Sequence, residues 1–130
     1  MAMPVRFPMR FTGLNRAMVL LGVVPELCRV ELDEAELRVR MSWVFHLDAP
    51  RASVRDARAD HAPVLGWGAH GWRGRWLVNG SSSGLVRLEL EPAARGFTAG
   101  VPVRVRVLRV SVEDPDALVE ALRTRGAPGR

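Results

Sequence analysis

The residues best suited to chemistry lie in one segment, which runs from position 67 to position 76. It holds three tryptophans, two arginines and a histidine among glycines: Trp67, His70, Trp72, Arg73, Arg75 and Trp76. Aromatic rings beside guanidinium groups can stack on single-stranded nucleic acid or on an aromatic ligand. The same residue types dominate protein–protein hot spots. A third interpretation is structural, in which the segment folds back and its tryptophans pack as local core. All three interpretations stay open at this point.

Motifs that suggest catalysis or a cofactor lack the elements that those functions need. The glycines at 66–71 fit G-x-G-x-x-G, but a dinucleotide site needs a strand before the motif and a helix after it. The segment 80–84 fits G-x-S-x-G, but a nucleophile elbow leads into a helix, and a strand pattern follows here. Asp60, His61 and His70 have no metal-ligand spacing. We therefore expect no catalytic site, no cofactor and no metal.

The charge balance has two interpretations. Nineteen basic residues oppose 14 acidic ones in 130 residues, a net charge of +5, and every basic residue is arginine. Arginine suits a surface for phosphate or carboxylate ligands, which the guanidinium group holds through two parallel hydrogen bonds. However, lysine, isoleucine and tyrosine are all absent. Their codons are rich in A and T, so we favour the codon usage of a high-GC bacterium as the explanation.

The length fits one domain, and little indicates export or membrane insertion. Cys28 is the only cysteine, which excludes an internal disulfide and fits a cytoplasmic protein. The longest apolar run near the N-terminus, at 17–24, is too short to span a bilayer. We interpret this run as belonging to a buried helix and not to a targeting segment. The short helix predicted in this region spans 13–22. The predicted layout is an arm at 1–12, a single domain at 13–126 and a tail at 127–130.

Alternating apolar and polar residues predict an antiparallel sheet. Six apolar residues at successive odd positions over 36–48 predict a single long strand. Asp33-Glu34-Ala35 predicts the turn that precedes it. The predicted strands are 28–33, 36–48, 51–58, 75–78, 85–91 and 101–112, with a loop over 60–74.

Two local patterns refine this arrangement. The Asn-Gly pair at 79–80 predicts a hairpin between the strands at 75–78 and 85–91. In the last strand, the apolar residues change from odd to even positions between Val107 and Leu108. This change predicts a bulge or bend there.

The clearest local pattern is at the C-terminal end. Asp114 is a good N-cap, Pro115 suits the first helical position, and Gly126 suits the position after the last turn. Leu118 and Leu122 lie one turn apart and form an apolar face. We predict a short amphipathic helix that closes the domain.

The order of these elements resembles the pleckstrin-homology-like (PH-like) barrel. The stretch RVLRVSVEDPDALVEAL at 106–122 resembles the last strand and capping helix of small uncharacterised PH-like proteins from high-GC bacteria. The resemblance implies an α+β fold that is mainly antiparallel β. It would be a six- or seven-stranded barrel or curved sheet with a short N-terminal helix and a C-terminal capping helix.

The resemblance also bears on partners, because PH-like barrels bind phosphoinositides, peptides or proteins, or serve as scaffolds. The lipid-binding members carry basic residues on the hairpin between their first two strands. The matching hairpin here, at 33–36, is acidic, so we do not expect phosphoinositide binding. We expect no specific nucleic-acid binding either, because no known nucleic-acid motif is present.

The sequence therefore predicts a non-catalytic binding or scaffold module. We expect it to contact another protein or a second copy of itself through the segment 67–76. The alternative is a small-ligand-binding barrel for an acidic or aromatic molecule, with arginines as anion anchors.

Four arginines lie on outward positions of two predicted strands. If those strands are neighbours, the arginines form a basic stripe. If glutamates on other strands lie between them, the face is mixed and solvated, and we favour this arrangement. The four are Arg38, Arg40, Arg104 and Arg106.

Overall fold

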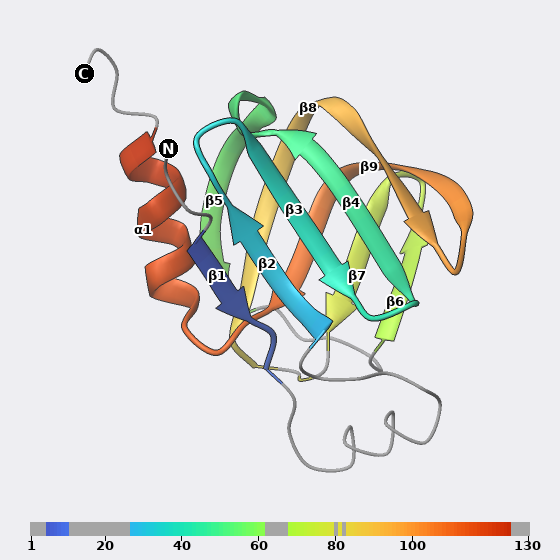
Figure 1. Ribbon diagram of the computed structural model, residues 1–130, viewed down its shortest axis with the longest axis horizontal. Helices are drawn as coiled ribbons and strands as arrows, with labels where there is room; N and C mark the ends of the chain where they lie inside the picture. Colours follow the sequence, from blue (N-terminus) through green and yellow to red (C-terminus); the bar gives the residue numbers. More distant parts are fainter. Residues whose placement is uncertain (1–4, 11–26, 62–67, 80, 82, 126–130) are drawn as a thin grey trace.

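The fold is a curled, mostly antiparallel sheet with one α-helix packed beside it (Figure 1). The computed structural model describes residues 5–10, 27–61, 68–79, 81 and 83–125. The helix predicted at 13–22 lies outside the described residues. The elements are β1 (Val5–Pro8), β2 (Cys28–Leu32), β3 (Glu36–Met41), β4 (Phe45–Pro50), the 3-10 helix η3 (Arg51–Ser53), β5 (Val54–Asp60), β6 (Gly68–Trp72), β7 (Arg75–Asn79), β8 (Leu85–Thr98), β9 (Val101–Ser111) and α1 (Pro115–Arg125).

The strands β1 to β4 form an antiparallel meander. Part of the predicted N-terminal arm is thus a strand, because β1 pairs with β2. The single strand predicted over 36–48 is wrong: it is the hairpin of β3 and β4, with Ser42 at a φ of 49° in the turn. Met41 pairs with Phe45. A turn of three residues keeps the odd–even pattern, so alternation alone cannot reveal it.

The turn predicted at Asp33-Glu34-Ala35 is confirmed. It joins β2 to β3, and the Asp33 carboxylate accepts the backbone N–H groups of Ala35 and Glu36, each at 2.8 Å. These hydrogen bonds lower the pKa of Asp33, so the carboxylate stays ionised well into acid. Because the Asp33 side chain bonds to the backbone of its own turn, the local sequence was sufficient to predict this turn.

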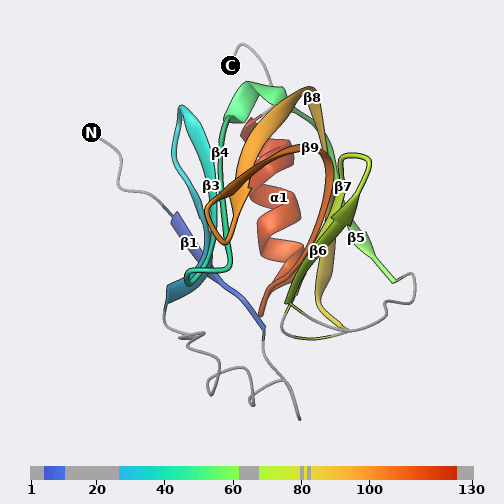
Figure 2. The same cartoon turned by 90° about the vertical axis from the view of Figure 1, so that its right-hand side faces the viewer.

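The long strand β8 joins the two halves of the sheet. Its first half pairs with β5, its far end pairs with β4, and β9 runs along its other edge. The register between β8 and β9 shifts between Glu89 and Ala94, which lie opposite Val107 and Val105. This shift confirms the bend predicted near Val107, and Figure 2 shows how far the sheet curls around it.

The predicted hairpin between β7 and β8 is wrong. The strand β9 lies between them, antiparallel to β8 and parallel to β7, with Val78 opposite Val110. The Asn-Gly segment is therefore part of a crossover. The Asn79 side chain is buried there and donates to the carbonyl oxygen of Ser81 at 2.7 Å. The local pattern was overruled by a strand from much later in the chain.

The curled sheet comes close to meeting itself at one end. Just beyond β1, Met9 forms an antiparallel bridge with Val112, just beyond β9. The backbone N–H of Arg10 donates to the carbonyl of Ser111 at 3.1 Å. The result is a curled half-barrel, which confirms the predicted antiparallel, barrel-like class.

The concave side of the sheet is filled by apolar side chains. Phe45, Leu88, Leu108 and Leu118 have 0% of their surface exposed, and Leu47 has 1%. A side chain with no accessible surface borders no internal space as large as a water molecule. A small ligand therefore has no room among these residues.

The predicted C-terminal helix is confirmed as α1. The Asp114 carboxylate accepts the N–H of Ala117 at 3.1 Å, which is the expected N-cap bond. The helix packs against β5 and β8, and its Leu118 and Leu122 are buried in the core.

Candidate functional site

The predicted binding segment forms a hairpin at one end of the sheet. The strand β6 is last in the strand order and pairs with β7. It contains His70 and Trp72, whose side chains lie outside what the structure describes, and Trp67 lies outside the described residues altogether. Part of the loop expected over 60–74 is therefore a strand.

The tip of this hairpin is tied to β9. Arg73 and Gly74 form the turn with φ values of 55° and 84°. The carbonyl of Gly74 accepts the N–H groups of Arg106 at 2.7 Å and Val107 at 3.1 Å. Arg73 and Arg75 are exposed, so the hairpin presents their side chains to solvent beside the bend in β9.

Trp76 belongs to the core. Its ring centroid lies 5.9 Å from that of Phe45, and it packs against the main apolar cluster. It also lies close against Gly71, where an added Cβ would be 2.2 Å from Cδ2 of the indole. The last glycine of the G-x-G-x-x-G match thus makes room for a ring. For Trp76, the packing supports the local-core interpretation.

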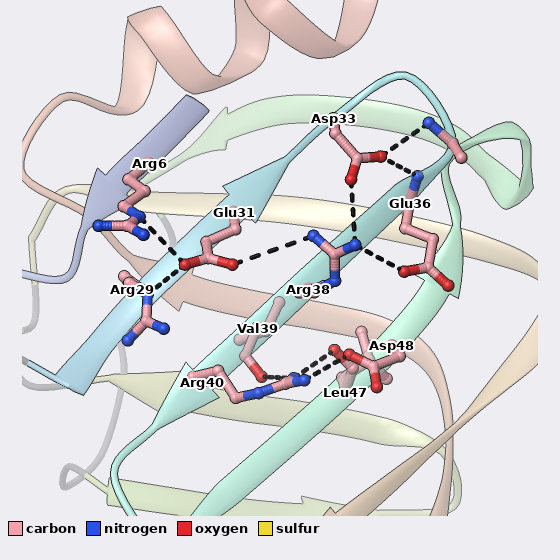
Figure 3. Close-up of polar contacts among 11 residues, drawn as sticks. Arg6, Arg29, Glu31, Asp33, Glu36, Arg38, Val39, Arg40, Leu47 and Asp48 are labelled. Atoms are coloured by element: carbon pink, nitrogen blue, oxygen red, sulfur yellow. Dashed lines mark hydrogen bonds and ion pairs between the residues drawn. The ribbon is translucent and has the colours of Figure 1, made fainter. Parts of the chain in front are cut away.

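The arginines on β1, β2 and β3 are paired with carboxylates (Figure 3). Glu31 is almost buried and lies 3.2 Å from Arg6, with Arg38 at 4.0 Å on its other side. Arg29 donates a hydrogen bond to it. This hydrogen bond, helped by the neighbouring positive charges, lowers the pKa of Glu31 although its burial opposes the shift.

The same pairing continues across β3 and β4. Arg38 lies 3.0 Å from Asp33 and 2.9 Å from Glu36, and these partners raise its pKa. Arg40 lies 2.8 Å from Asp48. The mixed charged face expected for Arg38 and Arg40 is confirmed.

A second set of arginines is arranged differently. Arg95 on β8 lies directly opposite Arg104 on β9, Arg106 follows on β9, and Arg75 lies on β7. Among the described residues, none of these four has a carboxylate within 4.0 Å. At longer range, the positive charge of Arg75 contributes to the lowered pKa of Glu89. The strands β4 and β8 separate β9 from β3, so no stripe joins Arg104 to Arg38.

A hollow of about 460 Å³ lies beside this second set, lined by Arg95 and Arg104 together with Pro92 and Pro102. Alternation in the sequence places Arg104 outward. It does not identify Arg95 as the facing residue, because that pairing depends on the register beyond the bend. Arg95 is therefore the binding candidate that sequence reasoning missed.

The other side chains with reactive groups, Cys28, Asp60 and His46, are buried or have a contact within the protein. Cys28 is buried at 1% exposure, and Asp60 lies 2.7 Å from Nε of Arg109. The His46 ring lies 3.2 Å from the carbonyl oxygen of Ser42. Within the described ranges, no three His, Cys, Asp or Glu side chains gather as a metal site. No helix in those ranges is long and apolar enough to cross a membrane.

Comparison of the chain with protein-family profiles, with curated proteins and with solved structures gave no match. The function must therefore be inferred from the geometry of the described residues.

Proposed function

We propose that this chain is a non-catalytic binding module whose partner adds to the free edge of β6. The supporting observation is the place of β6 at the end of the sheet, where β7 is the one strand paired with it among the described residues. An extended segment can hydrogen-bond to such an edge and continue the sheet. Edge strands are commonly protected by charged side chains or proline, and Gly68–Trp72 contains no arginine, aspartate, glutamate or proline.

A second copy of the chain fits this edge most simply. Two β6 strands can pair antiparallel about a twofold axis, which is the commonest symmetry of homodimers. This pairing places the two hairpin tips at opposite ends of the joined strands. The charges of Arg73 and Arg75 in one copy then do not oppose those in the other.

Light scattering after size-exclusion chromatography tests the proposal. The wild-type mass should rise toward a dimer with protein concentration. Trp72→Ala should weaken the dimer, and Trp72→Lys should abolish it, because a charged residue on an edge disfavours strand pairing. Trp43→Ala is the matched control, since Trp43 is 55% exposed on the β3–β4 turn, and it should leave the mass unchanged. A wild-type monomer at every concentration, or a dimer that survives Trp72→Lys, would overturn the proposal.

We also propose that the fold is a variant of the PH-like barrel in a cytoplasmic protein. The curled antiparallel meander and the helix that follows the last strand support the first part. The lone buried Cys28 supports the second. The β2–β3 hairpin carries Asp33 and Glu34, and Arg38 beside it is already paired, which disfavours a phosphoinositide there.

The second candidate function is the binding of a small acidic ligand. The filled core directs such a ligand to the outside of the sheet. The observation that favours it is the arginine-lined hollow beside β9.

A further inference from the structure

Three hollows adjoin one another along the outer side of β9, which lies between β8 and β7 (Figure 1). Their volumes are about 460, 310 and 200 Å³. Ala93 lines both the first and the second, and Val107 lines both the second and the third. The three hollows are therefore neighbours along β9, and together they are termed here the arginine groove.

The arginine groove contains the whole positive excess of the chain. Its lining has seven arginines and two glutamates, Glu89 and Glu91, a net charge of +5, which equals that of the chain. Of the chain's 19 basic and 14 acidic residues, 12 of each therefore remain outside it. In hollow order, the seven are Arg95 and Arg104, then Arg55 and Arg106, then Arg75, Arg87 and Arg109.

Three of these seven arginines have a carboxylate partner. Arg55 lies 3.6 Å from Glu91, Arg87 pairs with Glu89, and Arg109 pairs with Asp60. The hydrogen bond from Arg87 lowers the pKa of Glu89, so this carboxylate is ionised at neutral pH. Its negative charge offsets the positive charge of Arg87. Among the described residues, no carboxylate therefore lies within 4.0 Å of the other four arginines.

The sharpest imbalance is the facing pair of Arg95 and Arg104. Like charges on directly opposite positions of paired strands destabilise a sheet. Arg29 and Arg40 also face each other, across β2 and β3, but there Glu31 pairs with Arg29 and Asp48 pairs with Arg40. An anion bound between Arg95 and Arg104 would neutralise both, and a dianion such as phosphate suits two facing guanidinium groups better than a single carboxylate does.

We propose that the arginine groove binds a linear chain of phosphate groups, of the inorganic polyphosphate type. Arg104 and Arg109 are five residues apart on β9, which is about 17 Å at roughly 3.3 Å per residue. The net charge of +5 spread over this length calls for an anion with closely spaced charges. Phosphates joined end to end provide such a series, and each offers several acceptor oxygens to the guanidinium groups.

The walls favour a phosphate chain without bases. The first hollow is bordered by Pro92, Pro102 and Val103. Trp76 reaches the third hollow, but its ring packs against Phe45 in the core. Within the described residues, the groove thus presents no free ring on which successive bases could stack.

Isothermal titration calorimetry with sodium tripolyphosphate and a longer polyphosphate tests the proposal. The matched variants are Arg95→Gln/Arg104→Gln and Arg6→Gln/Arg123→Gln, which remove the same charge. Arg6 on β1 and Arg123 on α1 are exposed, and neither lines the groove. The wild type and the control pair should bind, with affinity that falls as salt is raised from about 50 to 200 mM. The groove variant should bind at least about tenfold more weakly, as expected from the loss of charge-assisted hydrogen bonds.

A thermal scan of each ligand-free variant separates this result from misfolding. Arg104→Gln should unfold at or above the wild-type temperature, because it removes a repulsion. It should also lose the rise in melting temperature that polyphosphate gives the wild type. Absence of binding at low salt, or equal losses in the two double variants, would overturn the proposal. Equal or tighter binding of a thymidine oligonucleotide or of polyglutamate would assign the groove to that ligand and overturn it as well.

Discussion

Substitution of Gly71 by alanine tests the packing of Trp76 most directly. A Cβ at position 71 would lie 2.2, 2.4 and 2.6 Å from Cδ2, Cε2 and Cγ of the indole, whereas carbon atoms in contact are about 3.5–4.0 Å apart. The ring cannot move away freely, since it packs against Phe45, which has no exposed surface. Either the ring or the β6 backbone must therefore shift.

The expected cost follows from this overlap. Forcing an extra carbon into a packed region typically costs about 1–3 kcal/mol. Alanine in a strand recovers roughly 0.5–1 kcal/mol relative to glycine, which offsets part of it. The net loss should be about 1 kcal/mol, which in a domain of this length lowers the melting temperature by about 4 °C. Calorimetry or urea unfolding of Gly71→Ala measures this loss.

A double-mutant cycle with Trp76→Ala shows whether the ring causes the loss. Alanine has no atom beyond Cβ and so lacks all three atoms that overlap at Gly71, and in this background Gly71→Ala should be neutral or slightly stabilising. The coupling between the two sites should then be about 2 kcal/mol, within the range for residues in contact. Wild-type stability of Gly71→Ala, or the same loss in both backgrounds, would refute the packing of Trp76 described above.

Three smaller changes examine other contacts. The hydrogen bond from Arg29 lowers the pKa of Glu31 in the folded protein below its value in the unfolded chain. The ionised Glu31 therefore stabilises the fold at pH values above the unfolded pKa, and this stabilisation is lost as pH falls through the folded pKa. Urea unfolding should show Glu31→Gln less stable than wild type at pH 7, with the gap closing in acid; a constant gap would contradict this. Asp114→Ala should cost about 1 kcal/mol by loss of the N-cap, and Asp114→Asn much less. Leu118→Ala should cost about 2–5 kcal/mol, and a cost near zero would show that α1 is not docked.

The sequence was sufficient where an element depends on its own residues. The C-terminal helix is specified by a cap at Asp114, a proline at 115 and leucines one turn apart. The β2–β3 turn is specified by Asp33, whose carboxylate accepts hydrogen bonds from the backbone N–H groups of Ala35 and Glu36, two and three residues later. The bend in β9 is visible as a change in which face of the strand is apolar. Each of these patterns has a short-range physical cause.

The sequence was insufficient where distant segments compete. The Asn-Gly pair at 79–80 favours a local hairpin, but β9 inserts beside β7 and makes a parallel pair that no local pattern encodes. The β3–β4 turn is hidden because its three residues preserve the alternation. Trp43 therefore seemed to be a core position, yet it is 55% exposed at the tip.

The candidate sites show the same division. The sequence offered Trp76 as a binding candidate or as local core, and its contacts with Phe45 and Gly71 show that it packs against the core. Arg95 was overlooked because its importance comes from lying opposite Arg104, which follows from the register of β8 on β9. A binding surface assembled from three strands requires their pairing to be known.

The arginine content itself now has two separable parts. The use of arginine in place of lysine concerns only the type of basic residue. It does not decide where aspartate and glutamate lie. Carboxylates accompany the arginines on β1, β2 and β3. In the part of the chain that the structure describes, the four arginines with no carboxylate within 4.0 Å lie along β9, in a groove with a net charge of +5. Facing arginines such as Arg95 and Arg104 repel each other and cost stability in the free protein. The position of these charges, more than their number, therefore indicates an anionic ligand.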